Sequence, residues 1–440
     1  MSRKESDKTR VHSFAFEFPT NAPSHILTSD GLENIATHKY VGGTYTYLDD
    51  FLQPMWTYLT SLLPMWIAPN MITTIGGMHC LFVYLILWKV SPNMDENVSV
   101  PDGLLVLSAY CTFVYYTLDC MDGKQARRTN TSSPLGQLFD HGMDCFCNIF
   151  HPATVASYTM IGGTYSYFKI MSSLQFAFFT AQWEEYYTHV LPHGCGKLFG
   201  VTEVNYGVAL LSLVNAFINR EVFWLQSLRY SLPGGAVSIL QMLPYQSQVQ
   251  AVLDLQTNEF GANAWFLLLS SQCFLSFFRT LPHCPTLAEK LSAMSKLFSP
   301  LALACLPFLV PFHLVQNNTR LISIAMGLMF DLITKKMIVF SMAKMSFAML
   351  QFDIVPFLFL TVCMRNNYFC DSSFVSNHPV SSFLCDADQS QSEEWNVRIM
   401  IGLCLWHLYR LSLWCRLAIL QITKRLDIYC FTIKPRTKKE

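Results

Sequence analysis

The chain has 440 residues, of which 52% are hydrophobic and 14% are charged, and its formal net charge at pH 7 is zero. An ordinary soluble domain carries about 25% charged residues, so this composition excludes a typical soluble protein and favours one embedded in a membrane. The neutral balance gives no electrostatic reason to expect nucleic acid as a partner.

The N-terminal part of the chain is polar and then amphipathic. Residues 1–44 contain no basic segment that leads into an apolar stretch ahead of a cleavage site, so we expect a cytosolic segment and no cleaved signal peptide. Residues 45–68 repeat apolar side chains every three or four positions and carry tryptophans, which predicts an interfacial amphipathic helix. A soluble amphipathic helix packed on the spans fits the same pattern.

The rest of the chain is organised by apolar runs, since roughly 20 apolar residues cross a bilayer as a helix. About ten such runs lie at 71–90, 103–119, 135–160, 164–183, 204–220, 263–279, 298–315, 320–335, 337–363 and 397–418. The apolar part of 222–262 is too short to span and is predicted to be re-entrant or interfacial. We therefore expect an all-α polytopic membrane protein with about ten transmembrane helices and a basic cytosolic tail at 421–440.

A cytosolic N-terminus places the basic loop 124–128 and the basic tail on the cytosolic side, as the positive-inside rule requires. It places the glycosylation sequons at 97–99 and 317–319 in the lumen, together with Cys370 and Cys385, which are free to form a disulfide there. This topology predicts a membrane protein of the endoplasmic reticulum or Golgi.

Four aspartates stand out because carboxylates are costly within spanning segments. Asp119 and Asp122 are three residues apart at the end of one span, and Asp140 and Asp144 are four apart near the start of the next. Each pair shares a helix face, and a short connection makes the spans antiparallel neighbours. Four carboxylates cannot stay ionised together in low dielectric without cations. Oxygen ligands favour Mg²⁺, Mn²⁺ or Ca²⁺, so the spacing predicts a metal site.

The residues around this cluster suit a diphosphate ligand. Gly123 admits a ligand to the backbone, and Arg127 offers a planar fork for phosphate oxygens. Lys124 and Arg128 are expected to remain solvated at the interface. A metal site beside such residues predicts phosphoryl transfer, which depends on positioning and charge neutralisation.

The same residues carry a family resemblance. The pattern D-x2-D-G-x2-A-R-x8-G-x3-D-x3-D from Asp119 to Asp144 is the motif of the CDP-alcohol phosphotransferases. The segment "DGKQARRTNTSSPLGQLFDHGMD" resembles the corresponding segment of the choline/ethanolamine phosphotransferases of eukaryotes. So do "APNMIT" at 68–73, "QWEEYYTH" at 182–189 and "VTEVNYG" at 201–207.

The resemblance implies an enzyme that moves phosphocholine or phosphoethanolamine from CDP-choline or CDP-ethanolamine to diacylglycerol and releases CMP. It implies two Mg²⁺ or Mn²⁺ ions, catalytic helices at 69–220, and a lipid-acceptor cavity and homodimer contacts within 221–420, with the active site facing the cytosol. It further implies that the metal ligands are Asp119, Asp122, Asp140 and Asp144, and that the CDP-binding residues are Asn70, Asp122, Gly123, Ala126, Arg127 and Gly136.

Several roles stay open at this point. Asp144 reaches the second metal or acts as the base, and His141 is a second candidate base or orients Asp140 by hydrogen bonding. Asn70 lines the nucleotide site or caps a helix behind Pro69.

The head-group candidates are Trp183, Glu184 and Tyr186, since aromatic faces and a carboxylate bind a quaternary ammonium. Ordinary interfacial residues give the same pattern.

The sequence leaves alternative functions open. They are another CDP-alcohol phosphotransferase, such as one with an inositol acceptor, a catalytically silent lipid scaffold, or an ion-coupled transporter. The transporter predicts inverted repeats, whereas the charged cluster occurs once.

Overall fold

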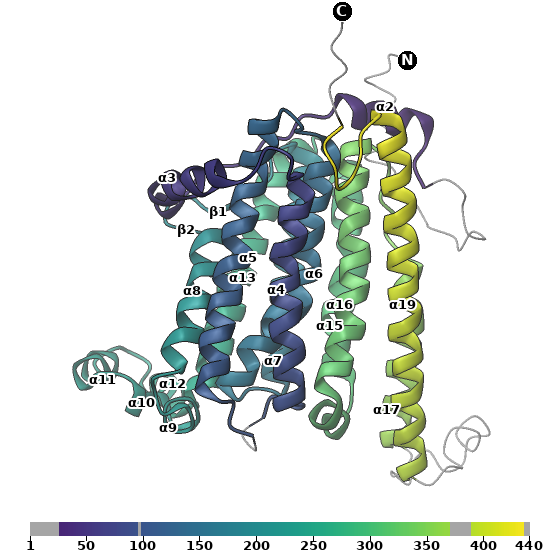
Figure 1. Ribbon diagram of the computed structural model, residues 1–440. Helices are drawn as coiled ribbons and strands as arrows, with labels where there is room; N and C mark the ends of the chain where they lie inside the picture. Colours follow the sequence, from purple (N-terminus) through teal and green to yellow (C-terminus); the bar gives the residue numbers. More distant parts are fainter. Residues whose placement is uncertain (1–25, 96–97, 370–388, 435–440) are drawn as a thin grey trace, which may run out of the picture.

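The computed structural model describes residues 26–95, 98–369 and 389–434. Long helices that run side by side form a bundle (Figure 1). They are α4 (Pro69–Val90), α5 (Asp102–Thr129), α6 (Pro134–Thr159), α7 (Tyr165–Thr188), α8 (Val201–Asn215), α13 (Thr257–Thr280), α16 (Phe312–Ala343), α17 (Val355–Phe369) and α19 (Gln389–Leu426). The short helix α15 (Phe298–Cys305) contacts α7 and α16. The expected all-α architecture is confirmed.

Shorter elements connect the bundle helices. The helical ones are α2 (Ser29–Thr37), α3 (Tyr47–Leu62), α9 (Arg220–Leu225), α10 (Leu228–Ser231), α11 (Gly234–Gln241), α12 (Gln246–Asp254), η1 (Leu281–His283), α14 (Leu287–Ser295), η2 (Leu306–Leu309) and η3 (Phe352–Ile354). The strands β1 (Gly194–Cys195) and β2 (Phe199–Gly200) pair antiparallel. Helices α2 and α3 lie at one end of the bundle, which we call the α3 end (Figure 1).

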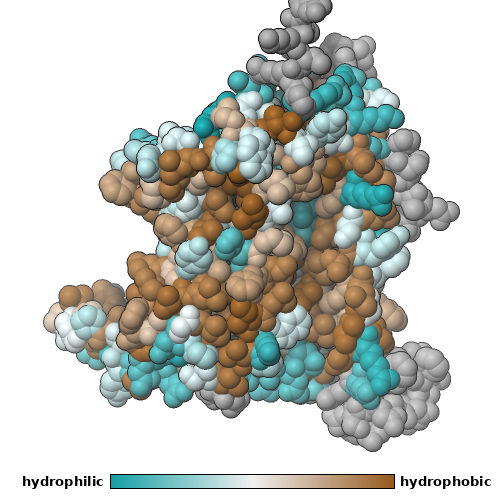
Figure 2. Space-filling model, viewed as in Figure 1, coloured by the Kyte–Doolittle hydropathy of each residue, from teal (hydrophilic) through white to brown (hydrophobic). Residues whose placement is uncertain are grey.

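The described helices include spans apolar enough to cross a membrane. Five qualify by length and composition: Pro69–Val90, Asp102–Thr129, Thr257–His283, Leu287–Leu309 and Asn396–Leu426. Helices α6, α7 and α16 also run through the bundle, but they bury polar side chains such as Gln137, Gln182 and Asp331. The visible face is mostly hydrophobic in its middle and more hydrophilic at both ends (Figure 2). The chain is an integral membrane protein.

One expected helix boundary is wrong. The apolar runs 320–335 and 337–363 suggested a break at Lys335 and Lys336, whereas α16 continues through both lysines to Ala343. Both lysines find carboxylates inside the bundle: Lys335 pairs with Asp331 at 2.5 Å and Lys336 with Asp353 at 2.7 Å. These pairs offset much of the cost of burying the charges, so the helix does not have to end there.

Helix α3 extends sideways from the bundle and is amphipathic (Figure 1). A capping box between Thr46 and Asp49 fixes its start. Trp56 is buried and donates a hydrogen bond to the Tyr206 hydroxyl at 2.9 Å, while Phe51 and other large apolar side chains are exposed. One face of α3 therefore packs on the bundle, whereas entry of its exposed face into the headgroup region stays a prediction.

The stretch 222–262 contains short helices at the end of the bundle opposite α3 (Figure 1). Helix α11 has no buried residue, and its Ile239 and the following Met242 are strongly exposed. The stretch does not span the bundle, as expected, and its interfacial position stays a prediction. The sequon at Asn97 and the Cys370–Cys385 pair lie outside the described residues.

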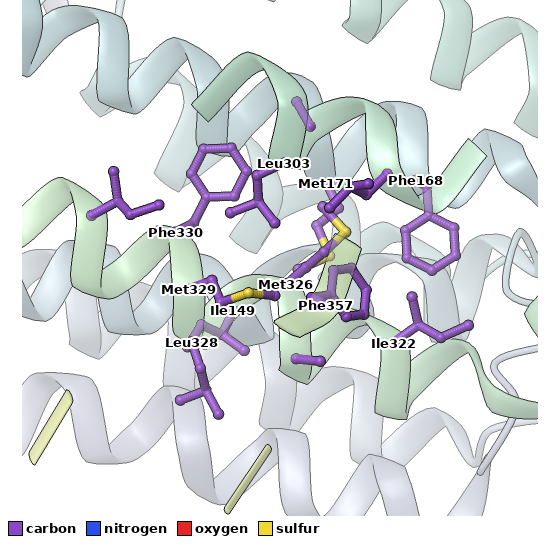
Figure 3. Close-up of a cluster of buried hydrophobic side chains, with 14 of the residues drawn as sticks. Ile149, Phe168, Met171, Leu303, Ile322, Met326, Leu328, Met329, Phe330 and Phe357 are labelled. Carbon is purple, nitrogen blue, oxygen red and sulfur yellow. The ribbon is translucent and has the colours of Figure 1, made fainter. Parts of the chain in front are cut away.

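Buried apolar side chains join α6 to α7 and α16 (Figure 3). Ile149 of α6 meets Met326 and Met329 of α16 in this cluster. Gly327 allows the close approach, because a Cβ atom there would lie 2.8 Å from Ile149 Cγ1. The α16 packing therefore holds the helix that carries Asp140 and Asp144.

Replacing Gly327 by valine is expected to destabilise the protein by about 1–3 kcal/mol, since extra methyl groups overfill a packed interface. The measurement is the thermal unfolding temperature in detergent. Gly402→Val is the matched control, because a Cβ at Gly402 of α19 meets nothing within 4 Å. Equal unfolding temperatures for the two variants would contradict the close packing of α6 on α16.

Candidate active site

The loop between α5 and α6 brings the four aspartates to the α3 end. Asn130 ends α5 in the left-handed conformation (φ 54°), and Ser133 caps α6 by accepting a hydrogen bond from the Gly136 N–H at 3.2 Å. Pro134 takes the first helical position, where its missing N–H costs nothing. The chain therefore reverses within a few residues, and the carboxylates of both helices face one another.

Three of the four aspartates form a compact oxygen cluster. Asp119, Asp140 and Asp144 each offer a carboxylate oxygen that lies within 4.8 Å of the others. Asp119 Oδ1 is buried without a hydrogen-bond partner among the described residues. Carboxylates this close repel one another unless a cation or protons neutralise them. An unpartnered buried oxygen in an all-oxygen cluster fits a hard divalent cation such as Mg²⁺ or Mn²⁺.

Asp122 lies one turn further along α5, outside this group of three, and is buried. Thr73 of α4 donates a short hydrogen bond to its carboxylate. The structure thus places Asp122 beside the cluster with one oxygen held by a hydroxyl. Its role as a fourth metal ligand and nucleotide contact stays a prediction.

Asn70 lies in the first turn of α4, where Ala68 is the N-cap and no side chain caps the helix. The capping alternative for Asn70 is therefore not realised in this structure. Its Nδ2 donates to the Cys430 carbonyl at 2.8 Å. Thr73, which binds Asp122, is one turn further on, so Asn70 lies close to the aspartates, and its nucleotide role stays a prediction.

Asp144 has a partner that sequence reasoning missed. The Tyr115 hydroxyl, one turn before Asp119 on α5, donates to Asp144 Oδ1 at 2.5 Å. The Tyr115 ring also packs edge-on against His151, with ring centroids 5.3 Å apart. A hydroxyl four residues before the first aspartate was the available signal, because that spacing faces the same side of a helix.

His141 lies beside the cluster. Its Nε2 is 3.9 Å from Asp140 Oδ2, and its buried Nδ1 has no hydrogen-bond partner among the described residues. Its ring meets that of Tyr40, with centroids 5.7 Å apart. At 3.9 Å the imidazole and the Asp140 carboxylate are not hydrogen-bonded, so the structure shows no orienting hydrogen bond. Both the role as a base and the orienting role stay predictions.

The remaining nucleotide candidates lie on α5 and α6 near the aspartates. Gly123, Ala126 and Gly136 are half-buried, and Arg127 is exposed. Lys124 and Arg128 also donate hydrogen bonds to α3 and to the residue that follows it. Lys124 donates to Thr57 at 3.2 Å, and Arg128 donates to the Leu63 carbonyl at 2.6 Å. Lys124 is half-buried and Arg128 is exposed, so the expected solvated interfacial role of the two residues stays a prediction.

The three head-group candidates contact other elements. Trp183 donates to the Ala293 carbonyl at 3.0 Å, and Tyr186 donates to the Met345 carbonyl at 2.8 Å. Glu184 pairs with Arg279 of α13 at 2.6 Å. The neighbouring Glu185 instead turns toward α6, where Gln137 donates to it at 2.9 Å.

Comparison with known proteins places this site in context. Residues 66–226 match the CDP-alcohol phosphatidyltransferase family. The chain is 29% identical to choline/ethanolaminephosphotransferase 2 of Arabidopsis thaliana over 94% of its own length and 99% of the relative. It is 37% identical to cholinephosphotransferase 1 of Gallus gallus over 45% of this chain and 58% of the relative. The matched region contains all four aspartates.

Proposed function

We propose, since this chain carries a CDP-alcohol phosphatidyltransferase domain at residues 66–226, that it is a choline/ethanolaminephosphotransferase. It transfers phosphocholine or phosphoethanolamine from the CDP ester to the hydroxyl of diacylglycerol and releases CMP. The observation that carries the proposal is the oxygen cluster of Asp119, Asp140 and Asp144 within the matched region. Asp122 adds a fourth carboxylate beside it.

We assign two Mg²⁺ or Mn²⁺ ions to these carboxylates. Asp119, Asp140 and Asp144 would hold the ions, and a bound ion would supply neutralisation of the charge that develops on the departing CMP. In this proposal the exposed guanidinium of Arg127 holds a pair of phosphate oxygens, and Gly123, which has no side chain, lets the diphosphate approach the α5 backbone.

The proton of the lipid hydroxyl goes to a base in the cluster, Asp144, or beside it, His141. Tyr115 occupies Asp144 Oδ1, which leaves Oδ2 as the acceptor. As the hydroxyl oxygen forms a bond to the phosphorus that bears the head group, the bond from that phosphorus to the bridging oxygen breaks. CMP leaves with the electron pair, and Asp144, or alternatively His141, retains the proton.

The aspartates lie toward the α3 end, which we propose faces the cytosol, because the basic residues of the α5–α6 loop lie there. Residence in the endoplasmic reticulum or Golgi is part of this proposal. The homodimer stays a prediction.

The test is product identification in liposomes that contain diacylglycerol, with CDP-choline and CDP-ethanolamine supplied separately. The proposal expects phosphatidylcholine, phosphatidylethanolamine or both, identified by mass spectrometry, together with an equal amount of CMP. Formation of neither lipid by folded protein would overturn it. Formation of phosphatidylinositol from CDP-diacylglycerol and inositol would replace it with the inositol alternative.

A further inference from the structure

Glu185 in the last turn of α7 is a buried carboxylate without a cationic partner. Its exposed fraction is 3%, and its side chain accepts one hydrogen bond, from Gln137 Nε2 at 2.9 Å. Among the described residues, no lysine, arginine or histidine nitrogen lies within 4.0 Å of this carboxylate. Buried carboxylates in proteins are nearly always paired, so Glu185 lacks the counter-ion that its burial calls for.

The position of Glu185 relates it to the aspartate cluster through α6. Gln137, which contacts Glu185, lies three residues before Asp140 and four before His141. Residues at this spacing share a helix face and are one turn apart, about 5 Å along the axis. Glu185 therefore lies beside the metal site and outside the group of aspartates.

The segment between α2 and α3 covers the same place. His38 Nε2 lies 2.8 Å from Gln137 Oε1, and the Tyr40 ring lies edge-on to His141. The Gly43 N–H donates to the Leu191 carbonyl at 2.8 Å, which fixes this segment against the loop after α7. Tyr40 is thus held against His141, beside the aspartate cluster, by contacts of the residues on both sides of it.

The Tyr40 side chain is partly exposed, and carboxylates lie near it. Its exposed fraction is 44%, so part of the ring can receive a ligand. Partial burial and then the nearby Asp140 and Glu185 carboxylates raise the pKa of the Tyr40 hydroxyl. A neutral ring next to carboxylates is the surrounding that attracts an alkylated ammonium group.

We propose that Glu185 and Tyr40 bind the cationic end of the donor's head group, so that its ammonium supplies the missing counter-ion of Glu185. This inference rests on the proposed function. In phosphocholine and phosphoethanolamine an oxygen and two carbons separate the nitrogen from the phosphorus. A cation site must therefore lie close to the metal cluster but outside it, as Glu185 does.

The test measures KM for CDP-choline and CDP-ethanolamine in the Glu185→Gln variant. We expect KM to rise about tenfold or more for both, since a buried hydrogen-bonded charge pair is lost. The inhibition constant of CMP should not change, because CMP has no head group. A donor in which the ammonium nitrogen is replaced by carbon, CDP-3,3-dimethylbutanol, should show the same KM with wild type and variant.

Tyr40 provides a second variant that does not depend on a buried substitution. Tyr40→Ala is expected to raise KM for CDP-choline several-fold, while Tyr40→Phe retains the ring and stays near wild type. Glu33→Gln is the matched control, because Glu33 is a carboxylate at the same end of the bundle that pairs with Arg425 on the surface.

Two outcomes overturn the inference while the proposed function stands. One is an unchanged KM in both Glu185→Gln and Tyr40→Ala when the wild type is active. The other is an equal loss with the uncharged donor or in CMP inhibition, which would indicate general distortion of the site. Absence of CMP release by wild type from either donor would overturn the proposed function, and this inference with it.

Discussion

Replacement of Asp119 by asparagine is expected to lower kcat/KM for CMP release by roughly 10³-fold, because it removes a charged ligand from the oxygen cluster. Asp119 lies within 4.8 Å of both Asp140 and Asp144, and its Oδ1 has no other partner among the described residues. An amide cannot supply the same charge to a divalent cation. The variant should therefore also bind Mn²⁺ more weakly, which electron paramagnetic resonance measures directly.

Asp102→Asn is the matched control for this experiment. Asp102 is on the same helix at the opposite end of the bundle, where it pairs with Arg220 at 2.9 Å. The control is expected to retain catalytic activity and Mn²⁺ binding. Wild-type Mn²⁺ affinity in Asp119→Asn would contradict the assignment of the cluster as the metal site, whatever the activity.

The second large effect is expected for Asp144→Asn, which should lower kcat about 10²- to 10⁴-fold, the usual contribution of a general base. The asparagine retains the shape and an acceptor for the Tyr115 hydroxyl, so the site should keep its geometry. The measurement is steady-state CMP release over a range of donor and lipid concentrations, with KM for the donor expected to stay within a few-fold.

His141→Gln is the comparison that separates the two candidate bases. If Asp144 is the base, the His141 variant loses much less activity than the Asp144 variant. A larger loss of kcat in His141→Gln would assign the proton transfer to the imidazole, and Asp144 would then be a metal ligand only. If both variants unfold in detergent at the same temperature as the wild type, misfolding is excluded as the cause of either loss.

The aspartate cluster could be predicted from the sequence because its geometry is local. Spacings of three and four residues fix which side chains share a helix face, and the short loop from Asn130 to Ser133 makes the two helices antiparallel. The structure brings Asp119, Asp140 and Asp144 together as that spacing predicts. The family match then agrees with the motif that carries these residues.

The orientation of α7 could not be predicted in the same way. Its apolar residues lie on all sides, so the sequence does not indicate which face meets α6. Glu184 and Glu185 differ by about 100° around the helix, and only the packed structure shows that one pairs with Arg279 and the other contacts Gln137. The sequence analysis named Glu184 and passed over Glu185 for this reason.

Contacts between segments far apart in the chain also could not be predicted from the sequence. Tyr40 meets His141 across about a hundred residues of chain, through a loop without a repeating pattern. The break expected near Lys336 failed for a similar reason, since the carboxylate that pairs with it, Asp353, lies beyond the end of α16. Local patterns cannot predict a charge that is neutralised from elsewhere in the bundle.

The measurement that tests the account most directly is CMP release by the purified wild-type protein with diacylglycerol. CDP-choline and CDP-ethanolamine are supplied separately, each with Mg²⁺ and with EDTA. The account predicts release from at least one donor, its loss in EDTA and its recovery when excess Mg²⁺ is added. Release that continues at the same rate in EDTA would contradict metal-dependent transfer at the aspartate cluster.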